Sequence, residues 1–224
     1  MSAAHPRGIS RELIVLRVCR ELRDGMVVNL GYGMPTLLAD IIPSDIDVLL
    51  HAENGVLGYG PYAKPGEEDP DIINPGGAHV TLRPGASTFD SAESFALVRG
   101  GHVDIAVLGA LQVSERGDLA NWMVPDRGVG GIGGAMDLAA GAKRVIAVME
   151  HVTKDGRPKL VRRCDYPLTA RACVHTIVTD LAVLEVVPDG LLLKELAPNV
   201  SAEEVQALSE PRLLIAPDLG EMQF

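Results

Sequence analysis

Glu53 is the residue whose position most suggests chemistry. It follows an apolar run over residues 46–50 and stands directly before a turn at Asn54-Gly55. The run is too apolar for a surface strand, and the glycines after it force the chain to turn. In open α/β sheets, ligands bind at the carboxyl ends of strands. Glu53 therefore lies where a nucleophile is expected, although a helix cap or a buried ion pair would also place a carboxylate there.

A glycine cluster over residues 128–134 is the second candidate. Residues 128–133 satisfy the pattern GxGxxG, and Glu150 follows at the spacing of a dinucleotide fingerprint. That fingerprint requires a strand immediately before its first glycine, whereas the sequence there is VPDR, so NAD binding is disfavoured. The cluster is more typical of a loop whose backbone N–H groups point at a ligand from the start of a helix.

Cationic side chains are concentrated in residues 153–163 of an otherwise acidic chain. They are Lys154, Arg157, Lys159, Arg162 and Arg163. A phosphate-binding patch is one interpretation, and a solvated polar connection is the commoner one. The six histidines show no HxxxH or HExxH spacing and no acidic cluster accompanies them, so we expect no metal site. The pattern GxSxG is absent, which leaves serine hydrolase chemistry unsupported.

Composition limits the class of protein. The chain has 224 residues, of which 47% are hydrophobic and 22% charged, as in an ordinary globular protein with one α/β domain. A formal charge of −10 disfavours nucleic acid as a partner. Three widely spaced cysteines without a CxxC pair favour a reducing, cytoplasmic setting. No apolar run reaches the ~18 residues of a membrane helix, so we expect no membrane association.

The apolar spacing predicts the elements that would hold Glu53. A helix over 10–22, capped by Ser10, precedes a buried strand over 26–30. Pro35 begins a helix through residue 42, and residues 46–50 form the next strand. The strands over 26–30 and 46–50 would be parallel neighbours, which would put Asn29 and Glu53 at adjacent strand ends.

Further elements are expected downstream. Residues 55–84 are rich in Gly and Pro and predict a long loop, of the kind that forms lids or partner surfaces. Beyond it we expect helices over 90–99, over 135–142 and from Ser201, and strands over 103–108, 145–149, 173–187 and 213–215. The ends, about 1–8 and 217–224, are expected to be short flexible tails of a single domain.

Seven short segments share a pattern when they are taken together. They are NLGYGMPT (29–36), ENG (53–55), PGAS (84–87), RGGHVD (99–104), GDLANW (117–122), GGAMDL (133–138) and YPLT (166–169). In this order, over about residues 10–200, they resemble the β subunit, or C-terminal half, of 3-oxoacid CoA-transferases of the succinyl-CoA:acetoacetate type. The resemblance implies an open, mixed and mostly parallel sheet flanked by helices, the CoA-transferase (NagB/RpiA-like) fold.

The resemblance also implies roles for individual residues. Glu53 would be the nucleophile, which forms a mixed anhydride with the donor acyl group and then a thioester with CoA. Backbone N–H groups of Gly133, Gly134 and Ala135 are the candidates for binding the oxyanions of these steps. The other substrate-binding candidates are Asn29, Gly31, Gly33 and Asn54, and the candidates for the CoA phosphates are Lys154, Arg157 and Lys159.

Two positions depart from the family pattern. Ala52 replaces the serine that usually precedes the glutamate, and Gly77 stands where a lysine is common. The loss of these two polar groups bears on how Glu53 is oriented and on which acyl group is preferred.

Partners and substrates follow from the same resemblance. The β half requires an α subunit, and we expect an α2β2 heterotetramer with CoA at the α/β boundary. Coenzyme A would be a substrate and a covalent intermediate, with no permanently bound cofactor. The expected reaction transfers CoA from succinyl-CoA to acetoacetate. A 3-oxoadipate CoA-transferase, an acyl-CoA hydrolase and a non-catalytic CoA-binding or scaffold subunit are the alternatives.

Overall fold

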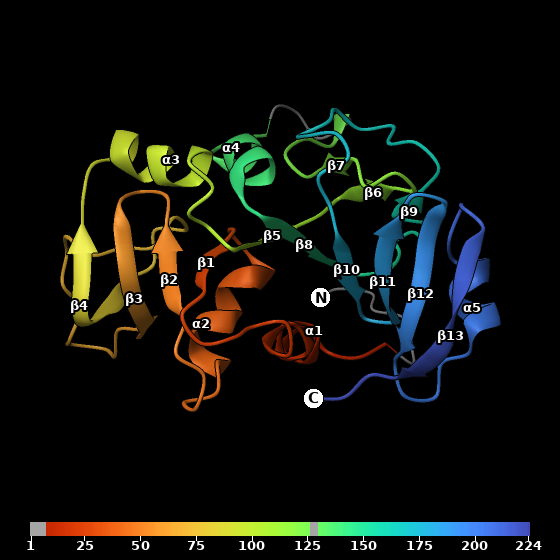
Figure 1. Cartoon of the computed structure of the whole chain (residues 1–224), viewed down its shortest axis with the longest axis horizontal. Coiled ribbons are helices and arrows are strands. Elements are labelled where there is room, and N and C mark those ends of the chain that lie inside the picture. Colours follow the sequence, from red (N-terminus) through yellow and green to blue (C-terminus); the bar gives the residue numbers. More distant parts are fainter. Residues whose placement is uncertain (1–7, 126–129) are drawn as a thin grey trace.

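The computed structural model describes residues 8–125 and 130–224, whose strands form one large sheet and one small one (Figure 1). The strand order of the large sheet is β13-β12-β11-β10-β8-β5-β1-β2-β3-β4. Its strands are β1 (Val27–Leu30), β2 (Leu49–Ala52), β3 (Val56–Tyr62), β4 (Val80–Thr88), β5 (Ile105–Gly109), β8 (Arg144–Met149), β10 (Thr176–Thr179), β11 (Ala182–Val187), β12 (Gly190–Leu196) and β13 (Leu213–Glu221). The small sheet consists of β6 (Gln112–Ser114), β7 (Leu119–Ala120) and β9 (Leu160–Val161), in the order β7-β6-β9.

The centre of the large sheet is parallel and its flanks are antiparallel. β10, β8, β5, β1 and β2 pair in parallel, while β3 and β4 on one side and β11 and β12 on the other pair antiparallel. β13 returns to the parallel direction beside β12. The expected mixed, mostly parallel open sheet is therefore confirmed.

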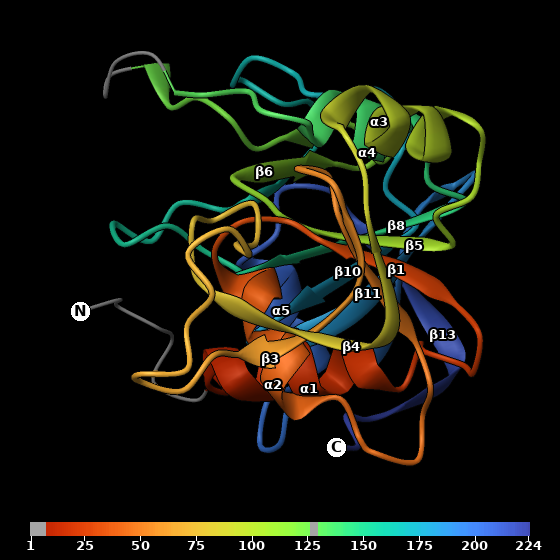
Figure 2. The ribbon, with the colours of Figure 1, turned by 90° about the vertical axis from the view of Figure 1, so that its left-hand side faces the viewer.

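Helices cover both faces of the parallel strands (Figure 2). α1 (Arg11–Cys19), the 3₁₀ turn η1 (Met34–Leu37) and α2 (Leu38–Ile41) lie on one face, and α3 (Ser91–Arg99) and α4 (Ala135–Gly141) on the other. α5 (Ala202–Ala207) lies beside β12 and β13 (Figure 1). Because both faces are covered, the central strands are largely buried and mostly apolar, and β8 is buried from Val145 to Met149.

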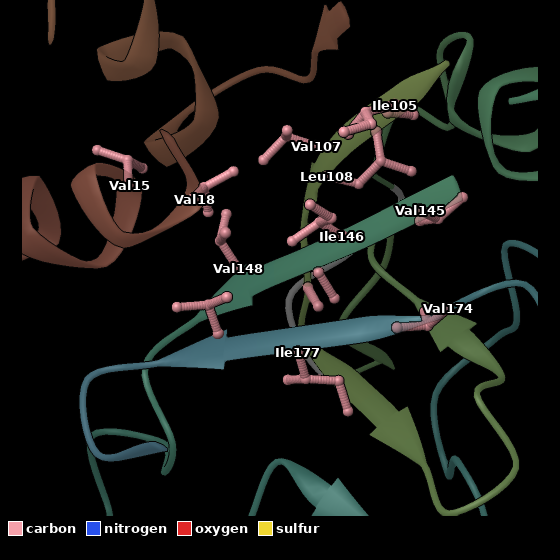
Figure 3. Close-up of a cluster of buried hydrophobic side chains, with 14 of the residues drawn as sticks. Val15, Val18, Ile105, Val107, Leu108, Val145, Ile146, Val148, Val174 and Ile177 are labelled. Atoms are coloured by element: carbon pink, nitrogen blue, oxygen red, sulfur yellow. The ribbon is translucent and has the colours of Figure 1, made fainter. Parts of the chain in front are cut away.

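The core lies between α1 and the parallel strands. Figure 3 shows Val15 and Val18 of α1 beside valine, leucine and isoleucine side chains of β5 and β8. Val15, Val18 and Ile146 are fully buried. β-branched side chains of this kind fit a pleated, buried surface, which explains why these runs form strands.

Side-chain caps begin three of the helices as the sequence predicts. The Ser10 hydroxyl accepts a bond from the Leu13 N–H, and the Asp90 carboxylate accepts one from the Glu93 N–H at 2.8 Å. At α5, Ser201 and Glu204 form a full capping box. The caps explain why these helix starts are predicted to the residue.

Several expected boundaries are wrong. The strand expected over 46–50 begins at Leu49 and ends at Ala52, and the Asp47 N–H before it bonds the Asp24 carboxylate instead of a neighbouring strand. The helix expected to reach residue 22 ends at Cys19, and the one expected over 35–42 is split into η1 and α2.

The long loop expected over 55–84 is wrong at both ends, because β3 and β4 occupy them. Their register shifts at Leu57/Tyr59, where Gly58 has a φ of 87°. Such bulges need glycine and break the alternation that marks a strand. The real connection covers residues 63–79.

The end of the chain also differs from expectation. Instead of a tail over 217–224, β13 continues through Glu221 because it pairs with β12 as far as Leu196. The other expected tail, 1–8, lies outside the described residues except for Gly8. β12 was not predicted at all, and the strand expected over 173–187 is two antiparallel strands, β10 and β11.

Candidate active site

A cleft of about 470 Å³ opens at the carboxyl ends of the central parallel strands. Its walls include Gly31 after β1, Glu53 after β2, Leu111 after β5 and Glu150 after β8. From β1 the chain turns to β2 on one side of the sheet, and β5 and β8 are later added on the other side. The cleft therefore lies where the strand order reverses, which is where open α/β sheets bind ligands.

The Glu53 carboxylate in this cleft is held by Asn29. β1 and β2 pair in parallel with Asn29 opposite His51, so the first residue after β2 lies beside the Asn29 side chain. The Asn29 Nδ2 donates to Glu53 Oε2 at 3.1 Å. The expected adjacency of the two strand ends is confirmed.

Asn29 does not reach the cleft itself. Its side chain is fully buried, and its Nδ2 also lies 3.1 Å from both the Nδ1 and the backbone oxygen of His51. The expected role of this amide in binding a substrate carboxyl stays a prediction, and in the structure its hydrogens face Glu53 and His51. In the structure, the Asn29 amide donates a hydrogen bond to the carboxylate of the nucleophile, Glu53.

The turn after Glu53 requires glycine at position 55. Gly55 has a φ of 118°, and its N–H bonds the Ala52 oxygen at 2.9 Å. A Cβ at this position would lie 2.0 Å from the Phe89 oxygen, much closer than any real contact. The turn therefore depends on a residue without a side chain.

Asn54 points away from the cleft. Its Nδ2 donates to the Ile73 oxygen at 2.7 Å, which ties the turn to the β3–β4 connection. Its expected role in substrate binding stays a prediction. The same connection contributes Pro75 to the cleft wall. Gly77, in this connection, has a φ of 78°, a backbone conformation that would be strained for any residue with a Cβ.

The other expected binding residues do line the cleft. They are Gly31, Gly33, Gly133, Gly134 and Ala135. Gly134 approaches the nucleophile closely, since a Cβ there would lie 3.2 Å from Glu53 Cγ and 2.8 Å from Phe95 Cζ. Their roles as N–H donors stay predictions. The first two residues of the glycine cluster, Gly128 and Val129, lie outside the described residues.

Two buried polar side chains, His51 and Ser94, lie on the side of Asn29 that faces away from the cleft. His51 and Ser94 are fully buried, and the His51 Nε2 lies 2.9 Å from the Ser94 hydroxyl. Burial lowers the pKa of His51 to about 4, so the ring is neutral at physiological pH. Neither residue could be predicted as part of the site, because no sequence motif links position 94 on α3 to position 51 on β2.

The expected phosphate-binding cations are not at the cleft. Lys159 is buried, its amino group lies 3.9 Å from the Glu150 carboxylate, and burial lowers its pKa to about 8. The Arg157 guanidinium donates to Asp155 at 2.7 Å, and Lys154 is exposed. None of the three lines the cleft that holds Glu53.

The cleft wall also includes Arg11, Tyr32 and Trp122, which were not predicted as site residues. Arg11 bonds the Glu150 carboxylate through its Nε at 2.9 Å, Tyr32 is 79% exposed, and Trp122 donates its indole N–H to the Leu168 oxygen at 3.4 Å. Tyr32 and Trp122 lie within two of the segments that carry the family resemblance. Their place in these segments is the feature of the sequence that could have identified them as site residues.

Metal-binding and membrane-spanning features are absent from residues 8–125 and 130–224. Within these ranges, no group of three or more His, Cys, Asp or Glu side chains could hold a metal ion. Over the same ranges, no helix has both the length and the apolar character needed to cross a bilayer.

Solved structures with the same fold include coenzyme A enzymes. An acyl-CoA transferase from Escherichia coli O157:H7 superposes with a TM-score of 0.79 at 22% identity, over all of this chain and 45% of that longer chain. Glutaconate coenzyme A-transferase from Acidaminococcus fermentans superposes with a TM-score of 0.70 at 17% identity, over 97% of this chain and 90% of that one. At these identities the likeness shows the fold alone.

Sequence relatives are much closer. The β-type subunit of a probable succinyl-CoA:3-ketoacid coenzyme A transferase of Bacillus subtilis is 53% identical over 90% of this chain and 93% of its own length. The corresponding subunit of a 3-oxoadipate CoA-transferase of Pseudomonas putida is 53% identical over 90% and 94%. The acetate CoA-transferase subunit beta of Escherichia coli is 49% identical over 94% and 96%. The family model described as Coenzyme A transferase matches residues 11–208, and the chain therefore belongs to the coenzyme A transferase family.

Proposed function

We propose that this chain is the nucleophile-bearing β subunit of a 3-oxoacid CoA-transferase, in which Glu53 carries CoA as a thioester. The observation that carries the proposal is the Glu53 carboxylate, which follows a parallel strand into the cleft and accepts a hydrogen bond from the buried Asn29 amide. The proposal includes a cytoplasmic location, a reaction with short carboxylic acids and an α subunit in an α2β2 assembly.

The first half of the reaction moves the donor acyl group. Because Asn29 holds Oε2, Oε1 is the oxygen of Glu53 that is left to attack the thioester carbonyl of the donor. The carbon–sulfur bond breaks, CoA leaves as a thiolate, and a mixed anhydride joins the acyl group to Glu53. The thiolate then attacks Glu53 Cδ, the donor carboxylate leaves, and Glu53 becomes the CoA thioester.

Asn29 and the glycine loop would stabilise the charges that develop. When the thiolate attacks Glu53 Cδ, negative charge gathers on Oε2, where the Asn29 N–H already donates. Around the acyl carbon, the backbone of Gly133 and Gly134 can approach closely because it carries no side chains. The acceptor carboxylate then attacks the Glu53 thioester, and the same steps in reverse release the new acyl-CoA.

Succinyl-CoA as donor and acetoacetate as acceptor are the proposed substrates. The resemblance to 3-ketoacid transferases supports this pair, and relatives of similar identity are named for 3-oxoadipate and for acetate. Transfer rates from succinyl-CoA to acetoacetate, 3-oxoadipate and acetate, measured side by side, test the choice. A higher rate with 3-oxoadipate or acetate would contradict the acetoacetate assignment.

The covalent step is tested by mass spectrometry. The chain, co-expressed with an α subunit, is incubated with succinyl-CoA alone and its intact mass is measured before and after borohydride. We expect a CoA-sized adduct on a peptide containing Glu53 that borohydride abolishes, because borohydride reduces thioesters. Glu53→Gln, which keeps the size of the side chain but removes the nucleophilic oxygen, should form no adduct.

Other outcomes identify the alternatives. An adduct that decays to free CoA at the full turnover rate without an acceptor would indicate a hydrolase. The absence of an adduct with succinyl-CoA, acetoacetyl-CoA and acetyl-CoA would contradict the proposal and favour a non-catalytic CoA-binding or scaffold subunit.

A further inference from the structure

The His51 ring is a buried titratable group near the nucleophile that the proposed reaction does not use. It is fully buried and lies 6.4 Å from the Phe89 ring, at 19° between planes. Its Nδ1 faces the Asn29 amide and its Nε2 faces the Ser94 hydroxyl. A continuous line of contacts therefore runs from Ser94 through His51 and Asn29 to Glu53.

The orientation of the Asn29 amide is fixed by its neighbours. Its Nδ2 lies 3.1 Å from the Glu53 carboxylate and 3.1 Å from the His51 backbone oxygen, which can only accept. Rotating the amide by half a turn would place its oxygen against both of these oxygens. The Asn29 Oδ1 makes no hydrogen bond among the described residues, so no contact of this oxygen favours the flipped orientation of the amide.

This orientation determines the tautomer of His51. A nitrogen that faces an amide N–H must accept, so His51 Nδ1 carries no hydrogen and Nε2 carries one. The Nε2–H then donates to the Ser94 hydroxyl, which lies 3.4 Å from the Ala52 oxygen and donates to it. Every donor in the line then has an acceptor, and no two hydrogens face each other.

We propose that His51 is a positioning residue: as a neutral ring with an accepting Nδ1, it holds the Asn29 amide in the orientation that donates to Glu53. The inference rests on the proposed function, because it concerns the same nucleophile. Without the ring acceptor, the second hydrogen of the Asn29 amide has only the backbone oxygen of residue 51. The amide is then held on that side by one acceptor instead of two, so the donor at Glu53 Oε2 is less firmly placed.

Two variants separate the acceptor from the bulk of the ring. His51→Leu keeps an apolar side chain of similar size without an acceptor, and His51→Asn places a polar atom near the position of Nδ1. In the complex with the α subunit, we expect His51→Leu to lower kcat roughly tenfold with KM for the acyl-CoA within about twofold. His51→Asn should recover most of the rate.

His151→Gln is the matched control. His151 is also fully buried, and its two ring nitrogens lie 3.0 Å from the Thr179 hydroxyl and 2.9 Å from the Ser209 hydroxyl, away from Glu53. It should lower the thermal midpoint as much as His51→Leu does but leave kcat unchanged. Equal kcat for wild type and His51→Leu, or an equal loss in His51→Leu and His51→Asn, would overturn the inference.

The tautomer provides a readout that does not depend on activity. Nitrogen NMR of histidine-labelled complex, with the His51 signals assigned by their loss in His51→Asn, should show the hydrogen on Nε2. A hydrogen on Nδ1 would overturn the inference while leaving the proposed function intact if wild type still forms the Glu53 adduct. If wild type forms no adduct, the proposed function fails, and the positioning role fails with it.

Discussion

At the scale of the residue, His51 gives the fold a specific dependence on pH. Its pKa is about 4 in the folded chain, because of burial, against 6.5 in the unfolded chain. Below pH 6.5 the unfolded state therefore binds a proton that the folded state does not. The stability that His51 contributes is complete above pH 6.5 and is lost as the pH falls toward 4.

The expected size of this effect is measurable. Between pH 6.5 and about 5, the wild-type free energy of unfolding should fall by about 2 kcal/mol more than that of His51→Asn, which has no group titrating there. Urea unfolding of both proteins at about pH 7 and about pH 5 provides the comparison. Equal losses would mean that His51 is protonated in the fold.

Sequence reasoning located some of these residues and not others. Glu53 and Asn29 could be placed because each lies at a strand end, and the strand pairing of β1 and β2 follows from the connection between them. Ser94 could not, because its contact with His51 joins α3 to β2 over a long separation in the chain. The direction in which Asn54 points also depends on how the β3–β4 connection packs against it, which the sequence does not predict.

At the scale of the element, α1 is fastened to the sheet by a buried arginine. Arg17 is 5% exposed and donates to both oxygens of Glu195 on β12, at 2.6 and 2.7 Å, and to Glu21 at 2.9 Å. This bidentate geometry is the strong form of an ion pair. Its removal leaves the Glu195 carboxylate without its partner in a largely buried place.

Arg17→Met should therefore lower the free energy of unfolding by about 3 kcal/mol in urea. Lys194→Met is the matched control, because Lys194 is the neighbour of Glu195 in β12 and pairs with the exposed Asp218 at 3.0 Å. An exposed pair of this kind contributes little to the free energy of unfolding, because water and salt screen it. Similar losses in the two variants would contradict the importance of burial.

The errors in predicted elements have a common physical cause. Helix starts were predicted well because a cap depends on residues three apart, as in Ser201 and Glu204. β3 and β4 were missed because glycines and register shifts interrupt their alternation, and their pairing with β2 comes from contacts that are distant in sequence. The predicted bounds of β2 were also wrong, because they are set by its parallel pairing with β1, a contact between segments distant in sequence.

At the scale of the whole molecule, the charge balance of the cleft supports the proposal that CoA is bound together with a partner chain. Among the described residues that line it, Arg11 is the one cation, and it is bonded to Glu150. CoA carries several negative charges, and the chain has a formal charge of −10. Cations from a partner chain would offset the repulsion between the CoA phosphates and this acidic chain.

The chain by itself should therefore show no measurable CoA transfer, and addition of the α subunit should restore it. Light scattering of the mixture should give the mass of two α and two β chains. Because the attraction is electrostatic, the KM for acyl-CoA should rise with salt. A lone β chain that is monomeric and fully active would contradict this assignment.

Trp122 is an intrinsic fluorescent probe of the cleft. It is the single tryptophan of the chain, and it stands in the wall of the cleft that holds Glu53. Indole fluorescence from this chain therefore originates at one known place and responds to the polarity there. Filling the cleft, loading Glu53 and covering the cleft with another chain can each be followed through the emission of this side chain, without attaching a dye.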